Sequence, residues 1–142
     1  MIRSLRSIII VLLTILSSVV AQGQSLCSLF DTGVNQNCVG DLEISWTDQT
    51  FCVGQPVGII PNILSTAENL IIDWGDGTPC QVIPAASVPD TVWHNYADPD
   101  TCISPASNIF LLVDVGITTI CNSNEVLSSY AIVPFTILFP PL

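Results

Sequence analysis

The chain has 142 residues with 12 acidic and 2 basic side chains, which gives a net charge of −10 at pH 7. Both basic residues, Arg3 and Arg6, stand at its beginning, so no lysine or arginine follows Arg6. Without cations the rest of the chain cannot neutralise phosphates, which excludes nucleic acid and anionic lipid surfaces as partners.

Residues 1–23 are expected to be a secretory signal peptide. Met1–Arg6 is basic, Ile8–Val20 is almost entirely apolar, and small residues follow at Ala21 and Gly23, which is the order of a cleaved signal. The apolar stretch is shorter than the roughly 20 residues that span a bilayer, so a retained anchor is the less favoured alternative. We therefore expect a secreted or cell-surface protein, without membrane insertion once the signal is removed.

About 120 residues remain, the size of one domain, and they contain all 6 cysteines. An even number of cysteines in an exported chain predicts disulfides. Zinc is the alternative, but the chain has no CxxC pair and His94 is its one histidine. Because six cysteines allow fifteen pairings, spacing alone does not choose among them. The cysteines are Cys27, Cys38, Cys52, Cys80, Cys102 and Cys121.

Residues 24–48 are polar and rich in turn residues, and they contain Cys27 and Cys38. Their apolar pattern is the alternation of Leu42, Ile44 and Trp46, which predicts one short strand. No strand is expected between Cys27 and Cys38, so closure of a local loop is the simplest pairing for these two. We expect a disulfide-linked N-terminal loop followed by a strand.

Residues 49–139 read as short strands separated by turn residues. No helical periodicity occurs, and the chain has 10 prolines, which together favour an all-β sandwich. Pro134 places the last strand at a sheet edge or at a bulge. The strands are expected within Val53–Ile60, Leu70–Trp74, Val88–Tyr96, Ile109–Thr119 and Ser129–Phe139.

Alternation along these strands predicts which side chains face the core. The inward sets are Leu70, Ile72 and Trp74; Val92, His94 and Tyr96; and Ile109, Leu111, Val113 and Val115. The outward residues are Ile71, Asp73, Trp93 and Asp114. A lone histidine on an inward face, with no evident base or nucleophile beside it, is expected to pack and hydrogen-bond rather than to catalyse.

Gly75-Asp76-Gly77 follows Trp74 directly and predicts a tight turn, since glycine tolerates positive φ. The Asp76 carboxylate can accept backbone N–H bonds across such a turn. We expect Trp74, at the end of an inward-alternating strand, to fill the core between the sheets.

Two segments, IDWGDGT at residues 72–78 and WHNY at residues 93–96, resemble the PKD domain, an immunoglobulin-like module of polycystins and of bacterial surface and secreted proteins. Phe51–Val57 resembles the opening strand of bacterial PKD repeats, so the resemblance covers about Asp48–Phe139. It implies an immunoglobulin-like β-sandwich in which the motif residues are structural. These residues are Asp73, Trp74, Gly75, Asp76, Gly77, His94 and Tyr96.

The resemblance also bears on the cysteines that the local pattern leaves open. In a PKD-like sandwich the ends carrying Cys52 and Cys121 should lie at one pole. The loops carrying Cys80 and Cys102 should meet. The resemblance therefore implies the pairs Cys52–Cys121 and Cys80–Cys102, beside the local pair Cys27–Cys38.

The sequence offers no recognisable enzyme constellation, and we expect no catalytic residues. A hydrolytic triad would need His94 as its base, and no G-x-S-x-G elbow accompanies the many serines. No glycine-rich phosphate loop occurs. The chain has enough carboxylates for the pair that glycoside hydrolysis requires, but the sequence indicates no site for them.

Calcium is the one ligand to weigh, because carboxylate and amide oxygens suit Ca²⁺. The signal is compositional, since the spacing does not match an EF-hand loop. We expect no cofactor and read these acids as solvated surface residues, with a structural calcium as the alternative. The candidate ligands are Asp73, Asp76, Asp98 and Asp100, and the chain also offers Asn122, Asn124 and Glu125.

These observations predict a non-catalytic interaction or spacer module of an adhesin-like secreted or cell-surface protein. Its expected partners are extracellular protein or glycan and neighbouring domains of the same chain; the fold alone names no ligand. One alternative is an accessory domain of a secreted hydrolase whose catalytic module lies beyond Leu142. Another is a structural subunit that self-associates by strand addition near Pro134. Residues 140–142 are expected to begin a proline-rich linker.

Overall fold

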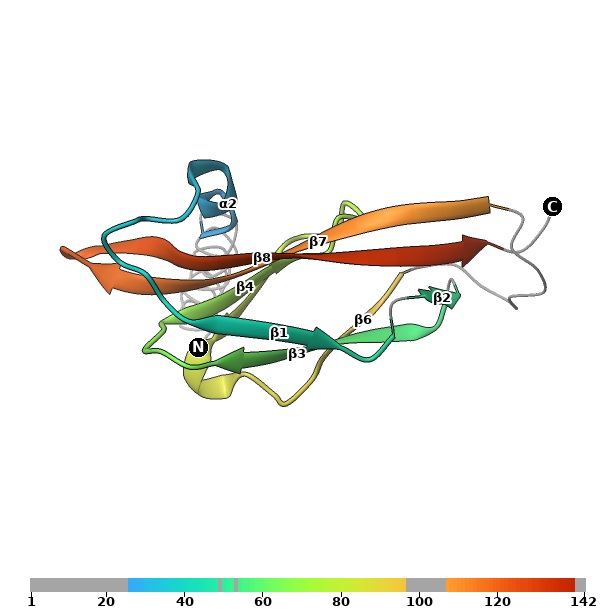
Figure 1. Ribbon diagram of the computed structural model, residues 1–142, viewed down its shortest axis with the longest axis horizontal. Helices are drawn as coiled ribbons and strands as arrows, with labels where there is room; N and C mark the ends of the chain where they lie inside the picture. Colours follow the sequence, from blue (N-terminus) through green and yellow to red (C-terminus); the bar gives the residue numbers. More distant parts are fainter. Residues whose placement is uncertain (1–25, 49, 53, 97–106, 140–142) are drawn as a thin grey trace, which may run out of the picture.

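The computed structural model describes residues 26–48, 50–52, 54–96 and 107–139. Within these ranges eight strands form two sheets, joined by loops, the short helix α2 (Leu29–Thr32) and a 3₁₀ turn at Ala85–Ser87 (Figure 1). The expected all-β sandwich is confirmed. The signal peptide predicted at residues 1–23 and the linker predicted at residues 140–142 lie outside the described residues.

The smaller sheet has three antiparallel strands in the order β1-β3-β6. These are β1 (Leu42–Trp46), β3 (Pro56–Ile63) and β6 (Val92–Asn95). Leu42, Ile44 and Trp46 pack against the core, as their alternation predicts. Because β1 pairs with β3 along its whole length, the sandwich includes part of residues 24–48, which were expected to precede a sandwich of residues 49–139.

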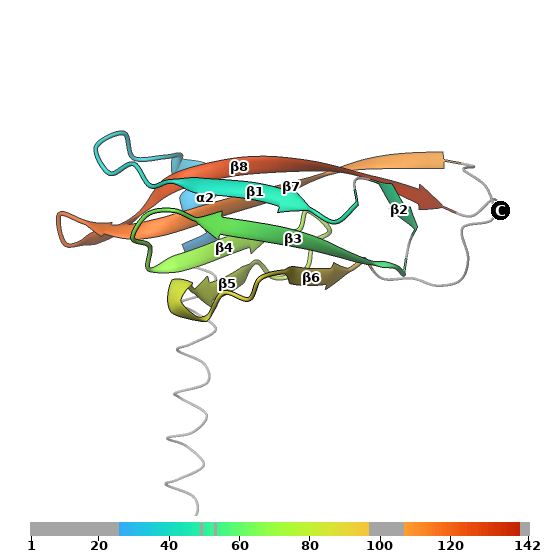
Figure 2. The same cartoon turned by 60° about the horizontal axis from the view of Figure 1, so that its bottom comes forward.

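The larger sheet has five strands in the order β2-β8-β7-β4-β5 (Figure 2). Its centre is the long β7–β8 hairpin, whose turn residues Asn122 and Ser123 have φ values of 50° and 68°, as a two-residue hairpin turn of the primed type requires. β2 pairs in parallel with residues 136–138 of β8, and the other pairs are antiparallel. The strands are β2 (Thr50–Cys52), β4 (Asn69–Asp73), β5 (Gln81–Pro84), β7 (Ser107–Cys121) and β8 (Asn124–Phe139).

β8 combines a bulge with a partly unpaired edge. The β7–β8 register shifts between Ile117 and Thr118, which leaves Ser128 as the extra residue of β8. Pro134 lies opposite Leu112 of β7, at a position that the β2 pairing does not reach. Pro134 therefore lies on a sheet edge, as predicted, where its missing N–H breaks no ladder.

The core lies between the two sheets and follows the predicted alternation. Leu70 and Ile72 are fully buried and Trp74 is 2% exposed, whereas Trp93, on the outward face of β6, is 56% exposed. Burial of this apolar surface is the main driving force for folding. The other buried core residues are Val57, Ile59, Val92, Tyr96, Val113, Val115, Ile117, Val133, Phe135 and Ile137; the side chain of Ile109 lies outside the described ones.

The N-terminal segment, residues 26–41, covers part of the outer face of the larger sheet. α2 lies on the opposite side of β7 and β8 from β1 and β3 (Figure 1). Cε1 of Phe30 lies 3.0 Å from the position that a Cβ on Gly116 would take. Ile71, the cross-strand partner of Gly116, is fully buried although it faces away from the core. The segment therefore gives the larger sheet a second buried face.

The same segment then passes along the edge of β8. Asn35 N donates to Leu127 O at 2.9 Å, and Gly40 N donates to Ser128 O at 2.7 Å. A Cβ on Gly40 would lie 2.6 Å from Ser128 Oγ, so glycine permits this close passage. These bonds satisfy backbone groups of β8 at the bulge, where an unpaired edge would otherwise be exposed.

Two disulfides join this segment to the larger sheet, and all three predicted pairs are wrong. The observed pairs are Cys27–Cys80 and Cys38–Cys121, with Cα atoms 6.2 Å apart in each; the predicted pairs were Cys27–Cys38, Cys52–Cys121 and Cys80–Cys102. Local closure fails because residues 27–38 extend over the sheet, so each end meets a different strand terminus. Cys52 is also disulfide-bonded, and Cys102 lies outside the described residues.

We expect non-reducing peptide mapping to find the pairs Cys27–Cys80 and Cys38–Cys121. These two disulfides close separations of 53 and 83 residues, so replacing either pair by serines should lower the free energy of unfolding by about 4 kcal/mol in the chain-entropy model. Denaturant melts of the two double variants measure this loss. Recovery of a Cys27–Cys38 peptide would contradict the arrangement.

Candidate functional site

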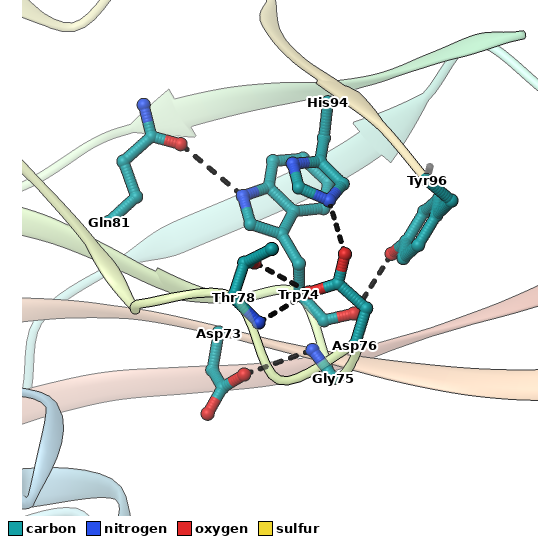
Figure 3. Close-up of polar contacts among 8 residues, drawn as sticks. All are labelled: Asp73, Trp74, Gly75, Asp76, Thr78, Gln81, His94 and Tyr96. Atoms are coloured by element: carbon teal, nitrogen blue, oxygen red, sulfur yellow. Dashed lines mark hydrogen bonds and ion pairs between the residues drawn. The ribbon is translucent and has the colours of Figure 1, made fainter. Parts of the chain in front are cut away.

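The turn after β4 brings the motif residues of both segments together. Gly75 and Gly77 have φ values of +72° and +80°, which L side chains rarely adopt. A Cβ on Gly75 would also lie 2.6 Å from the carbonyl oxygen of Leu112. The chain can therefore turn here only with glycine at Gly75, and the turn places Asp76 beside β6 (Figure 3).

Trp74 is the centre of an aromatic cluster that spans the two sheets. Its indole stacks on His94 with ring centroids 4.5 Å apart and planes 9° apart, while Tyr96 meets Trp74 edge-on at 6.4 Å. The indole Nε1 donates to Gln81 Oε1 at 3.3 Å, which satisfies the polar atom of this buried side chain. Trp74 comes from the larger sheet and His94 from the smaller, so the stack joins the sheets.

The Asp76 carboxylate is held by three hydrogen-bond donors. Oδ1 accepts from Thr78 N at 3.0 Å and from Thr78 Oγ1 at 2.5 Å, and Oδ2 lies 2.8 Å from His94 Nε2. The side chains of His94 and Asp76 are 15% and 18% exposed. Burial raises the pKa of Asp76, but the hydrogen bonds from Thr78 and His94 outweigh it and hold that pKa below its ordinary value.

Tyr96 and Asp73 complete the turn. Tyr96 donates its hydroxyl hydrogen to the carbonyl oxygen of Trp74 at 2.9 Å. Burial, with the nearby charges of Asp76 and Asp73, raises the pKa of Tyr96 well above its usual range, so the hydroxyl remains a donor. Asp73 Oδ1 accepts from Gly75 N at 2.9 Å, and this hydrogen bond stabilises the start of the turn.

Thr78 and Gln81 belong to this network but were not singled out from the sequence. A threonine two residues after an aspartate in a turn is a local signal, since Asx turns bind the N–H at that position. Gln81 carries no such signal, because its contact with Trp74 depends on the pairing of β4 with β5.

The structure describes only some of the candidate calcium ligands. Asp73 and Asp76 bind the turn as described, Asn124 Nδ2 donates to the Asn122 carbonyl, and Asp98 and Asp100 lie outside the described residues. Within the described ranges, no three histidine, cysteine or acidic side chains are placed to hold a metal ion. None of the helices in the same ranges is long and apolar enough to cross a bilayer.

Compared with protein-family models, with curated proteins and with solved structures, the chain matches none. The geometry of the site is one of packing and mutual hydrogen bonding: His94 faces Asp76 with one ring nitrogen and stacks its ring on Trp74.

We expect Trp74→Ala to lower the free energy of unfolding by about 3–5 kcal/mol, because it empties a core site between the sheets. Trp93→Ala is the matched control, since it removes the same side chain from a position that is 56% exposed. It should cost less than about 1 kcal/mol. Thermal or urea melts of the two variants measure the difference, and equal losses would contradict an aromatic cluster that joins the sheets through Trp74.

Asp76→Asn should destabilise the protein at neutral pH and progressively less in acid. Because the folded state lowers the pKa of Asp76 below 3.8, the ionised carboxylate stabilises the fold above about pH 4, and this contribution is lost as pH falls through the folded-state pKa. Urea melts of parent and variant between about pH 6 and pH 2 should show the gap in unfolding free energy closing. A gap that widens in acid would reverse the assigned sign.

Proposed function

We propose that this chain is a secreted, non-catalytic interaction and spacer module with an immunoglobulin-like sandwich of PKD type. The observation that carries the proposal is the cluster of Trp74, Asp76, His94 and Tyr96. These residues are the ones that would have to supply chemistry, and each is engaged in holding the turn and the two sheets together.

The strand order supports the immunoglobulin-like assignment. The smaller sheet, β1-β3-β6, has the order of strands A, B and E of that fold, and β8-β7-β4-β5 has the order of strands G, F, C and C′. The sequence segments on which the PKD resemblance rests also meet in space. His94 and Tyr96 both contact Trp74, at separations of 20 and 22 residues along the chain, so the two segments form one structural unit.

The disulfides are consistent with an oxidising, extracellular environment. Disulfides form and persist in oxidising, extracellular surroundings, and two are present among the described residues. They support export, while the signal peptide stays a prediction from the sequence.

The alternative of self-association by strand addition is less well supported. The edge of β8 is occupied at two places, by the bonds from Asn35 and Gly40 at the bulge and by β2 at residues 136–138. Pro134 lies in the stretch between them and donates no backbone N–H. A strand adding there would find few free donors. An accessory role beside a hydrolase module remains compatible with the spacer function.

The proposal is tested on protein secreted by an exporting host, whose N-terminus should be Gln22 or Gln24 by mass spectrometry. The parent and a His94→Gln variant are assayed against peptide, ester and glycoside substrates, and both are applied to arrays of extracellular proteins and glycans. We expect no turnover by either protein and equal binding by both. Turnover that His94→Gln abolishes would refute the non-catalytic assignment, and an intact Met1 terminus would refute export.

A further inference from the structure

An apolar strip lies on the outer face of the β7–β8 hairpin. Leu112, Ile132 and Tyr130 are 57%, 49% and 39% exposed, and Pro134 is exposed as well. Leu112 pairs with Pro134, and Tyr130 pairs with Gly116 four residue pairs further along the hairpin. Since paired residues, and residues two apart on one strand, share a face of a sheet, these four side chains form one surface, here called the open strip.

The open strip begins where the N-terminal segment ends its cover. Phe30 of α2 packs over Gly116 and lies 5.6 Å from the ring of Tyr130, centroid to centroid. Beyond α2 the two strands continue toward the C-terminal end of the sandwich (Figure 1). The buried outer face of the sheet therefore passes directly into an exposed apolar one.

Two carboxylates stand beside the strip, directly opposite each other. Asp114 of β7 lies in the row of Ile132 and is the cross-strand partner of Asp73 of β4. Like charges in that arrangement destabilise a sheet, and no lysine or arginine follows Arg6 in the chain to compensate them. The pair therefore makes a local excess of negative charge inside an otherwise apolar surface.

Both carboxylates are held in place by neutral donors. Tyr130 donates its hydroxyl hydrogen to Asp114 Oδ1 at 2.6 Å, and Gly75 N donates to Asp73 Oδ1 at 2.9 Å. Burial and the bond to Asp114 raise the pKa of Tyr130 to about 12, so the phenol remains protonated. In the part of the chain that the structure describes, these two bonds engage Oδ1 of each carboxylate and not Oδ2.

We propose that the open strip, with Asp73 and Asp114, docks a protein segment that carries an arginine or lysine between apolar side chains. The proposal rests on the interaction function proposed above and specifies its face and its partner. The apolar side chains would cover Leu112 and Ile132, and the cation would lie between the two carboxylates. An arginine suits this position best, because its planar guanidinium offers several donors to two acceptors.

Charge decides against a second copy of this chain as the occupant. Two copies packed through the strip would bring four carboxylates together, and neither copy has a cation after Arg6 to place between them. A partner with basic residues gains attraction from the whole acidic domain as well as from the pair.

The probe is a blocked eight-residue peptide of alternating arginine and valine, titrated into the ¹⁵N-labelled mature protein at low salt. We expect saturable amide shifts centred on Leu112, Asp114 and Ile132. Asp73→Asn combined with Asp114→Asn should weaken binding about tenfold. Asp41→Asn combined with Asp90→Asn is the matched control, because it removes two exposed charges elsewhere, and should change the affinity less than about twofold.

A second variant, Leu112→Ser with Ile132→Ser, tests the apolar half of the surface and should weaken binding at least about fivefold. Its melting temperature should change little, because both side chains are about half exposed in the parent protein. Shifts centred on another face, equal losses in the control, absence of binding, or equal binding of an arginine–serine peptide would overturn the proposal. So would a dimer in sedimentation that the double serine variant dissociates. These outcomes would leave the proposed non-catalytic module intact as a proposal, whereas turnover that His94→Gln abolishes would refute its non-catalytic assignment.

Discussion

Because no lysine or arginine follows Arg6, the folded domain must stabilise its carboxylates with neutral donors. Within the described ranges the one ion pair is His94 with Asp76, and it is ionic only when the histidine is protonated. Elsewhere hydroxyl and amide groups donate the hydrogen bonds that carboxylates often receive from lysine and arginine. Tyr130 donates to Asp114, Asn62 to Glu43, and both Asn69 and Thr118 to Glu125. Cohesion therefore depends on burial, backbone pairing and disulfides, and the surface keeps its negative charge.

Under that constraint the N-terminal segment has a structural role that its composition conceals. Its Phe30 packs over Gly116, the cross-strand partner of the buried Ile71, and the segment covers the β8 edge at the bulge and is fixed at Cys27 and Cys38. This turn-rich segment would gain little from packing alone, since none of its residues is fully buried. The two disulfides restrict the unfolded chain instead. They reduce the conformational entropy that is lost when the segment is ordered, so weak contacts suffice to hold it in place.

The sequence predicts the parts of this fold that depend on local pattern. Leu70, Ile72 and Trp74 alternate over a strand with one core face, and the Gly-Asp-Gly turn follows from backbone freedom alone. The disulfide pairs could not be derived, because they depend on the path of residues 26–41 across the sheet. β5 was missed because its four residues, Gln81–Pro84, are too few to show a period. The open strip was equally hidden: alternation places Leu112 on the face opposite Leu111 and Val113, but whether that face is covered depends on the path of the N-terminal segment.

The alternation of β4 connects the aromatic cluster around Trp74 to the open strip. Trp74 faces the core and stacks on His94, while Asp73, one residue earlier, faces the outer surface beside Asp114. Gly75 serves both, since its N–H binds Asp73 and its missing Cβ lets the turn approach the backbone of Leu112. A side chain at Gly75 would displace the turn from β7 and move Asp73 relative to the strip. The residues that resemble a structural motif thus also fix the position of one carboxylate on the outer face, so the stability of the sandwich and the geometry of that face depend on the same backbone turn.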